Sequence, residues 1–321
     1  MTKPEPPFEP ADFSKIRTYS IRQRKSLVTI DMFASINDYK KSGKLGDLFP
    51  DILKAKDLRA VVTAIRRARS EGKPVIVGMG AHVIKVGLAP IIIDMMTRGF
   101  IDVIAMNGAG GVHDMEIAFH GATSEDVSAE IQEGRFGMVE ETAAHFNGAI
   151  KKYNEPGRGL GERLGRYIVE NKMPGANVSI LAMAYELGKV VTIHSAIGTD
   201  IVHMHPGMDG GLTGEATLND FKLFTGAVSR LTGGGVYMNI GSAVLLPEVF
   251  IKALSAARNL GSDVSGFTTV NMDMIQGYRP TVNVVNRPIK GEGEGISLTG
   301  SHEIMIPLLY HLLLNEGEDT A

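Results

Sequence analysis

The segment His194–Asp209 carries three histidines and two aspartates, side chains that can bind metals or move protons. A His-x-His pair such as His203 and His205 on a strand places both imidazoles on one face, which suits zinc or another transition metal. With His194 and Asp209, the pair would fit a metal-dependent hydrolase that activates water. The same side chains also fit two other interpretations, hydrogen-bonded polar residues of a loop and a ligand site without metal.

Glycine clusters in three turns of the chain, at Gly78–Gly80, Asn107–Gly111 and Gly233–Gly235. We expect all three where an open parallel sheet presents the carboxyl ends of its strands, the edge at which such sheets bind ligands. Glycine lets the backbone approach a phosphate or ring closely, and a following helix N-terminus favours an anion. None of the turns matches G-x-G-x-x-G, so both a nucleotide site and simple tight turns remain open.

Two lysines are candidates for covalent chemistry, because an amine in a desolvated position can form an imine. Lys85 stands in an apolar helix start, and Lys290 begins an alternation of glycine and glutamate that ends at Gly295. The acidic alternation would suit a cationic substrate, or it is a solvated hairpin loop. Either lysine also fits a surface position.

Composition excludes several classes of protein. The 33 basic and 36 acidic residues give a net charge of −3, which argues against nucleic-acid binding. The chain has no cysteine, which excludes disulfides, thiolate nucleophiles and iron–sulfur clusters. No apolar stretch of membrane-spanning length and no secretory signal pattern is present, so we expect a soluble cytoplasmic protein without membrane partners.

Short apolar runs alternate with amphipathic runs along the chain, the pattern of a parallel sheet covered by helices. The sequence therefore predicts an α/β fold, a three-layer Rossmann-like parallel sheet flanked by helices. The predicted strands are Pro74–Gly78, Ile101–Met106, Val190–Ala196, Gly235–Ile240 and Phe267–Val270. The predicted helices include Leu58–Ser70, Val83–Arg98, Leu218–Leu231 and Pro247–Asn259.

One domain is expected, at residues 26–315, because no low-complexity linker interrupts it. Residues 1–25 are rich in proline and charge, which predicts an N-terminal arm, and residues 316–321 form a polar tail.

The motifs Ala-Gly-Gly-Val at Ala109–Val112 and Gly-Gly-Gly-Val at Gly233–Val236 resemble the deoxyhypusine synthase family. The resemblance runs from about Pro74 to Leu309. It implies a Rossmann-like domain that forms homotetramers and binds NAD near subunit interfaces. Members of the family oxidise spermidine, capture its butylamine part on a lysine as an imine, and pass it to a lysine of a translation factor.

The turns and the resemblance together assign a set of positions to the cofactor. The family's Thr-Asp is matched at Thr199–Asp200, and Ser301 stands within the family's Ala-Asp-Ala beside NAD. The candidate NAD-binding residues are Gly78, Gly80, Ala109, Gly110, Gly111, Asp114, Asp200, Gly233, Gly234, Gly235 and Ser301. No resident metal is expected in this interpretation.

The chain departs from the family where the family does its chemistry. The family's Trp-Gly-Lys falls at Asn286–Pro288, where there is no lysine, and the chain has no tryptophan. Lys290 lies two residues further and would keep the same facing on a strand. The family's Lys-His-His becomes Met238–Ile240.

We therefore expect a relative that binds NAD and acts on an amine or polyamine, by dehydrogenation with aminobutyl-type transfer as a further step, rather than a true deoxyhypusine synthase. Lys290 is its candidate catalytic residue. A metal-dependent hydrolase that uses His194, His203, His205 and Asp209, with His205 and Asp209 as catalytic candidates, is one alternative. A non-catalytic member of the family is the other.

Overall fold

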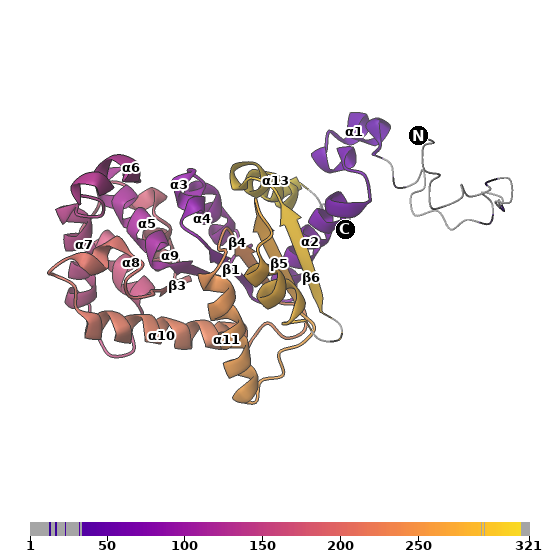
Figure 1. Ribbon diagram of the computed structural model, residues 1–321. Coiled ribbons are helices and arrows are strands. Elements are labelled where there is room, and N and C mark those ends of the chain that lie inside the picture. Colours follow the sequence, from indigo (N-terminus) through magenta and orange to yellow (C-terminus); the bar gives the residue numbers. More distant parts are fainter. Residues whose placement is uncertain are drawn as a thin grey trace, which may run out of the picture.

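A six-stranded, wholly parallel β-sheet forms the centre of the protein in the computed structural model (Figure 1). The structure describes residues 34–289, 291 and 293–315, together with the isolated residues 13, 17, 23 and 32. The strands are β1 (Val75–Met79), β2 (Val103–Asn107), β3 (Val190–His194), β4 (Val236–Ile240), β5 (Thr268–Asp273) and β6 (Glu294–Thr299). Their order across the sheet is β3-β2-β1-β4-β5-β6, the doubly wound order of dinucleotide-binding folds.

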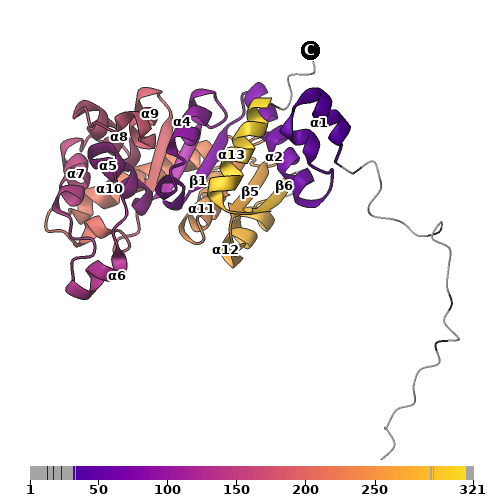
Figure 2. The same ribbon diagram turned by 90° about the horizontal axis from the view of Figure 1, so that it is seen from above.

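Helices cover both faces of this sheet (Figure 2). One face carries α2 (Leu53–Ser70), α4 (Ala89–Thr97), α5 (Gly108–His120), α8 (Leu160–Glu170), α9 (Ile180–Glu186) and α13 (His302–Asn315). The other face is covered mainly by α10 (Gly210–Val228) and α11 (Leu245–Asn259). The predicted three-layer α/β fold is thereby confirmed.

Shorter elements connect these layers. They are α1 (Ile36–Ser42), η4 (Leu45–Leu48), α3 (His82–Lys85), α6 (Val127–Glu130), η5 (Ile131–Glu133), α7 (Glu140–Lys152), η6 (Ala176–Val178), η7 (Ile201–Met204), α12 (Tyr278–Pro280) and η8 (Thr281–Asn286).

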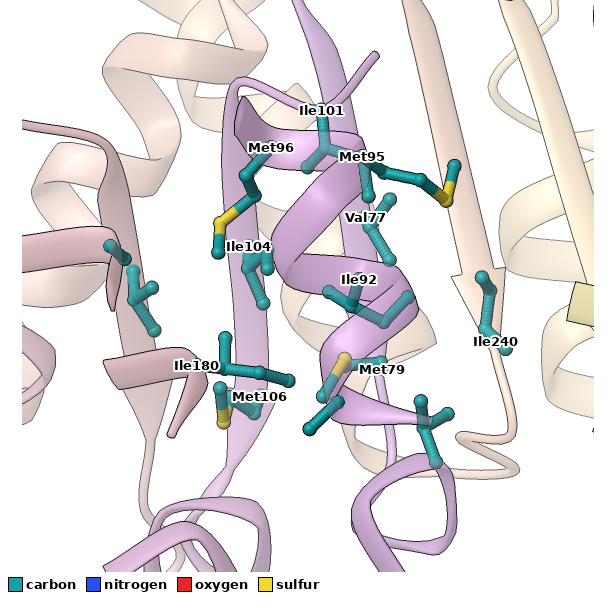
Figure 3. Packing of buried hydrophobic residues seen from close by; sticks show 14 of the residues in the cluster. Val77, Met79, Ile92, Met95, Met96, Ile101, Ile104, Met106, Ile180 and Ile240 are labelled. Atoms are coloured by element: carbon teal, nitrogen blue, oxygen red, sulfur yellow. The ribbon is translucent and has the colours of Figure 1, made fainter. Parts of the chain in front are cut away.

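Strand side chains alternate between two apolar layers, as a pleated sheet requires. In β1, Val77 faces the layer of α4 and α9, while the neighbouring Ile76 faces the layer of α10 and α11. Figure 3 shows Ile92 of α4 lying over the central strands and Ile180 of α9 beside Met106 of β2. All these residues are buried, so burial on both faces explains why the strands read as continuous apolar runs.

One local prediction was wrong. The single helix expected at Val83–Arg98 is two helices, α3 and α4, because Gly87 between them adopts a left-handed φ of 78°. Of the glutamate-glycine alternation, the last two residues, Glu294 and Gly295, belong to β6. Most of the expected N-terminal arm and the expected polar tail lie outside the described residues.

Candidate functional site

The carboxyl ends of β1 and β4 meet at the centre of the sheet. The backbone N–H of Gly80 donates to the carbonyl of Ile240 at 2.9 Å, and a Cβ atom on Gly80 would lie only 2.2 Å from the carbonyl oxygen of Gly241. From this contact the chain passes to α4 on one face and to α11 on the other. This divergence makes the β1–β4 junction the topological switch point of the sheet, the place at which open α/β sheets bind ligands.

Beside the switch point, the N-terminus of α5 is occupied by a side chain of the protein itself. The N–H of Ala109 donates to the carboxylate of Asp200, which lies so close that a Cβ atom on Gly108 would be 1.9 Å from Asp200 Oδ2. Asn107 caps the same helix, because its Oδ1 accepts from the N–H of Gly110 at 2.9 Å. Asp200 therefore takes the place at which an anionic ligand would otherwise meet α5.

Two neighbouring side chains orient Asp200. Ser195 Oγ donates to Asp200 Oδ2 at 3.2 Å and lies 3.1 Å from His203 Nε2. His203 Nδ1 accepts from the backbone N–H groups of Gly198 and Asp200, so Nε2 carries the proton and donates to Ser195. Because the imidazole is already a donor toward the hydroxyl, this histidine, serine and aspartate form a structural cap rather than an activated nucleophile. Burial raises the pKa of Asp200.

A cavity of about 210 Å³ opens next to Asp200, between α3 and the first half of α5. Its polar lining includes Lys85, His113, Glu116, Glu125 and Asp200. A second cavity of about 530 Å³ shares Glu116 and Glu125 with the first and extends along α5. The carboxylates outnumber the single lysine in this polar lining, so the paired cavities favour a cationic ligand.

Glu116 is the buried acid common to both cavities. Its Oε1 accepts from Thr142 at 2.9 Å, and its Oε2 accepts from Thr123 and lies 3.7 Å from His113 Nδ1. Burial by itself would raise the pKa of Glu116, but the hydrogen bonds from His113, Thr123 and Thr142 outweigh it and lower the pKa below its ordinary value. Glu116 is therefore a carboxylate that stays ionised although it is buried.

On the other side of the switch point, buried polar side chains line the carboxyl ends of β4 and β5. Asn239 Nδ2 donates to Asn271 Oδ1 at 2.7 Å, while Asn239 Oδ1 has no partner within the protein. His302, 1% exposed, also has no hydrogen-bonding partner for either ring nitrogen, and its Nε2 lies 3.8 Å from Asp273 Oδ1. Sequence reasoning missed Asp273, although an acid that directly ends an apolar strand is a signal that could have identified it.

The predicted NAD-binding residues divide into three groups by position. Gly80, Ala109, Gly110, Gly111 and Asp200 lie at the carboxyl edge, as does Ser301, which directly precedes α13. Gly78 lies inside β1, where a Cβ atom would be 2.5 Å from the Tyr237 hydroxyl oxygen. Gly233, Gly234 and Gly235 precede β4 and therefore lie at the amino-terminal edge of the sheet, so their expected place at a carboxyl end was wrong.

Asp114 belongs to α5, and its side chain binds the start of α9. Its carboxylate accepts from Ser179 Oγ at 2.5 Å and from the backbone N–H groups of Ile180 and Leu181 at 2.8 and 3.0 Å. It is fully buried, and burial raises its pKa to about 6. These contacts make Asp114 a cap for the N-terminus of α9, with no oxygen directed to a ligand.

Lys290 lies outside the described residues. The described residues that follow it lead into β6 at the amino-terminal edge, with Gly293 beside the carbonyl of Phe267. Lys85, the other lysine candidate, lines the 210 Å³ cavity.

The histidines and aspartates considered for a metal site do not converge. His194 is buried at the end of β3 with its Nε2 3.0 Å from Thr192 Oγ1, and burial lowers its pKa to about 4. His205 Nε2 donates to the carbonyl of Gly137 at 2.8 Å, and Asp209 caps α10. Within the part of the chain that the structure describes, no three His, Asp or Glu side chains gather at a distance suited to a metal ion. His203 lies in η7 rather than on a strand, so the alternative that paired it with His205 on one strand face was wrong, and both imidazoles are hydrogen-bonded to backbone groups instead.

Among the described residues, no helix is long and apolar enough to cross a membrane.

No protein-family model matches the sequence, and no curated protein matches it. Solved structures share its fold. A conserved, provisionally assigned LOR/SDH protein from Methanococcus maripaludis S2 gives a TM-score of 0.52 and 15% identity over 82% of this chain and 70% of that one. AgrE, in a ternary complex with ornithine and NAD+, gives 0.52 and 13% over 82% of this chain and 34% of AgrE.

A provisionally assigned deoxyhypusine synthase from Entamoeba histolytica gives a TM-score of 0.51 and 10% identity over 85% of this chain and 93% of that one. This chain thus has the α/β fold shared by deoxyhypusine synthase-like and LOR/SDH-like proteins, and it spans about a third of the length of AgrE. At these identities the likeness concerns the fold.

Proposed function

We propose that this protein binds NAD along the carboxyl edge of its sheet and uses it to oxidise an amine. The observation that carries the proposal is the switch point itself, where β1 and β4 meet and the chain diverges to opposite faces. Among proteins that share the fold, AgrE has been solved with ornithine, an amine, and NAD+ together.

Groups around the switch point suit a dinucleotide. His302 and Asn239 carry buried polar atoms without a partner in the protein, which ligand groups would satisfy. Gly80 and Ser301 lie at the same edge, Gly80 directly after β1 and Ser301 directly before α13. Because Asp200 already occupies the N-terminus of α5, the phosphates would be held on the side of β1 and β4 rather than at α5.

The substrate's ammonium group would bind at Glu116. An ionised, buried carboxylate forms strong charge-assisted hydrogen bonds with an ammonium, and Glu125 adds negative charge to the same cavity. His113, which lines this cavity beside Glu116, is the group placed to accept a proton from the bound amine. NAD, when bound, supplies the acceptor for the hydride from the carbon that bears the amine.

The finer points belong to the same proposal and come from the resemblance in sequence. They are a polyamine substrate, aminobutyl transfer through Lys290 and a homotetramer, to which the sequence pattern adds a cytoplasmic location. Loss of turnover in Lys290→Ala would support the imine step, whereas full activity would remove Lys290 from the account.

Isothermal titration with NAD, followed by NADH formation over a panel of diamines, polyamines and amino acids, tests the proposal. We expect NAD binding and amine-dependent NADH formation, and Glu116→Gln should raise the KM for the amine by about tenfold or more with an unchanged Kd for NAD. Glu133→Gln, at an exposed position paired with Arg135, is the matched control. No NAD binding at about 1 mM would refute the proposal, and binding without turnover of any amine would favour the non-catalytic alternative.

A further inference from the structure

The sheet has two halves, β1 with β2 and β4 with β5, whose strands end at equivalent positions. Met79 of β1 pairs with Met106 of β2, so Gly80 and Asn107 are the next residues at the carboxyl edge. Ile240 of β4 pairs with Met272 of β5, so the next residues there are Gly241 and Asp273. In each half, a glycine therefore follows the first strand, and a polar residue is the last residue of the second strand.

The polar residue that ends the second strand has a defined role in dinucleotide-binding halves, where an acid at this position binds ribose hydroxyls. In the first half the position is Asn107, whose side-chain oxygen is engaged in capping α5. In the second half it is Asp273, whose Oδ1 accepts from the N–H of Met274 at 2.7 Å and whose side chain is 13% exposed. Of these two residues, only Asp273 is an acid, and its carboxylate can accept further hydrogen bonds.

His302 stands beside this acid in a conformation that leaves its nitrogens unused. Its ring lies against Gly241, whose φ is 63° and on which a Cβ atom would be 2.8 Å from the ring carbon Cε1. The ring of His82 approaches edge-on at 5.4 Å. A buried imidazole whose nitrogens have no hydrogen-bonding partner destabilises the protein, so a polar partner from a ligand would be favourable here.

We propose that Asp273 and His302 bind the 2′,3′-diol of a ribose, so that the ribose anchor of this fold lies in the second half of the sheet. The carboxylate accepts from the hydroxyls, and His302 donates to a ribose oxygen after a small rotation of its ring. Exposed apolar side chains at the same edge, Val244, Met274 and Ile275, provide a surface for the attached base or nicotinamide ring. The inference rests on the proposed NAD binding for the identity of the whole ligand, and the titrations below distinguish the ribose of adenosine from that of nicotinamide.

Titrations of wild type, Asp273→Asn and His302→Phe with NAD, NADP, AMP and nicotinamide mononucleotide test the site. Both substitutions should weaken NAD binding by about tenfold or more, since a charged hydrogen-bonding group is lost or left unmatched. Asp263→Asn, an exposed position in the connection from α11 to β5, and His311→Asn, an exposed position on α13, should bind as wild type.

The titration with NADP distinguishes the loss of ribose binding from a loss of folded structure. If the ribose is that of adenosine, Asp273 repels the 2′-phosphate, so Asp273→Asn should bind AMP less tightly and shift the NAD-to-NADP preference toward NADP. If the ribose is that of nicotinamide, Asp273→Asn should bind nicotinamide mononucleotide less tightly, and the NAD-to-NADP preference should not change.

Unchanged NAD affinity in both variants would overturn the ribose site and leave the proposed function standing. If the wild-type protein does not bind NAD but binds AMP or nicotinamide mononucleotide through Asp273, the ribose site stands and the proposed function is refuted. Binding of none of the four probes would refute both.

Discussion

At the scale of single residues, the main feature of the site is a carboxylate of the protein that lies where a bound anion would meet α5. Asp200 sits on the N-terminus of α5, where Gly108 leaves room for its carboxylate and Ala109 donates to it. A negative charge at this position offsets the partial positive charge of the helix end. The chain therefore stabilises α5 without a ligand, and an incoming phosphate must bind elsewhere.

Removing this internal anion should open an anion site. In Asp200→Ala we expect a loss of about 1–2 kcal/mol in the free energy of unfolding, measured by urea denaturation, from the lost cap and charge. We also expect phosphate to raise the melting temperature of this variant more than that of wild type, because the free helix end can bind it.

Asp209→Ala is the control for this substitution, since Asp209 caps the exposed start of α10 by accepting from Leu212 at 3.0 Å. It should lose a similar amount of stability, and its response to phosphate should be smaller, because the start of α10 is exposed to solvent, which weakens its attraction for an anion. Equal phosphate responses in the two variants would mean that the α5 end is not an anion site.

Short motifs mark Asp200 and Asp114 in the sequence, but the sequence did not show that each carboxylate lies at the N-terminus of a helix. Both were assigned to the cofactor, yet Asp114 caps α9 through Ser179, a residue 65 positions away in the chain. Which partner a buried carboxylate finds depends on helix packing across the sheet, and a single sequence carries no direct signal for that.

At the scale of elements, α8 is held unusually close to the sheet. A Cβ atom on Gly161 would lie 2.0 Å from the carbonyl oxygen of Val191 in β3, and the Gly161 N–H donates to Asp220 Oδ2 at 2.9 Å. Because the added Cβ atom would meet backbone atoms rather than a side chain, a rotamer change in α8 or β3 cannot relieve the clash.

Gly161→Ala should therefore lower the free energy of unfolding by about 1–3 kcal/mol, because overpacking forces α8 away from β3. Gly148→Ala offers a matched control in α7, since the nearest atom to its Cβ would be the Tyr167 hydroxyl at 3.7 Å. There we expect a gain of about 0.5–1 kcal/mol from helix propensity. Chemical denaturation of both variants checks the pair, and equal effects would show that α8 is free to shift.

Element types were predictable where periodicity was clear, as for β1, β2 and α2. The errors arose where a glycine-rich turn could precede or follow a strand. Gly233–Gly235 reads in sequence like the turn at Gly78–Gly80, but it enters β4 instead of leaving a strand. β6 escaped prediction because glycine and glutamate at its start hide the apolar alternation of Ile296 and Leu298.

At the scale of the whole molecule, three buried ionisable groups couple folding to pH. Burial raises the pKa of Asp114 to about 6 and that of Asp220 to about 7, and it lowers the pKa of His194 to about 4. Asp220 joins three elements, since its Oδ2 accepts from Gly161 and from Ile193, while its Oδ1 has no partner. A proton on that unpartnered oxygen removes the cost of burying the charge.

These shifts have opposite consequences. Between its ordinary pKa near 4 and its folded pKa, each aspartate binds more protons in the folded chain than in the unfolded one, so stability falls as pH rises. His194 binds fewer protons in the folded chain between about pH 4 and 6.5, so its contribution rises with pH there. The two carboxyl groups outweigh the single imidazole, and these groups together favour the folded state at mildly acidic pH.

Asp220→Asn isolates the largest of these contributions, because the amide keeps the shape of the protonated carboxyl and does not titrate. The free energy of unfolding of wild type minus that of Asp220→Asn should fall by roughly 1.4 kcal/mol per pH unit between about pH 4.5 and 6.5 and level off above about pH 7.5. Urea denaturation of both proteins at a series of pH values measures this difference. A difference that does not change with pH would mean that Asp220 titrates alike in the folded and unfolded chains, and that burial between α8, α10 and β3 leaves its charge solvated.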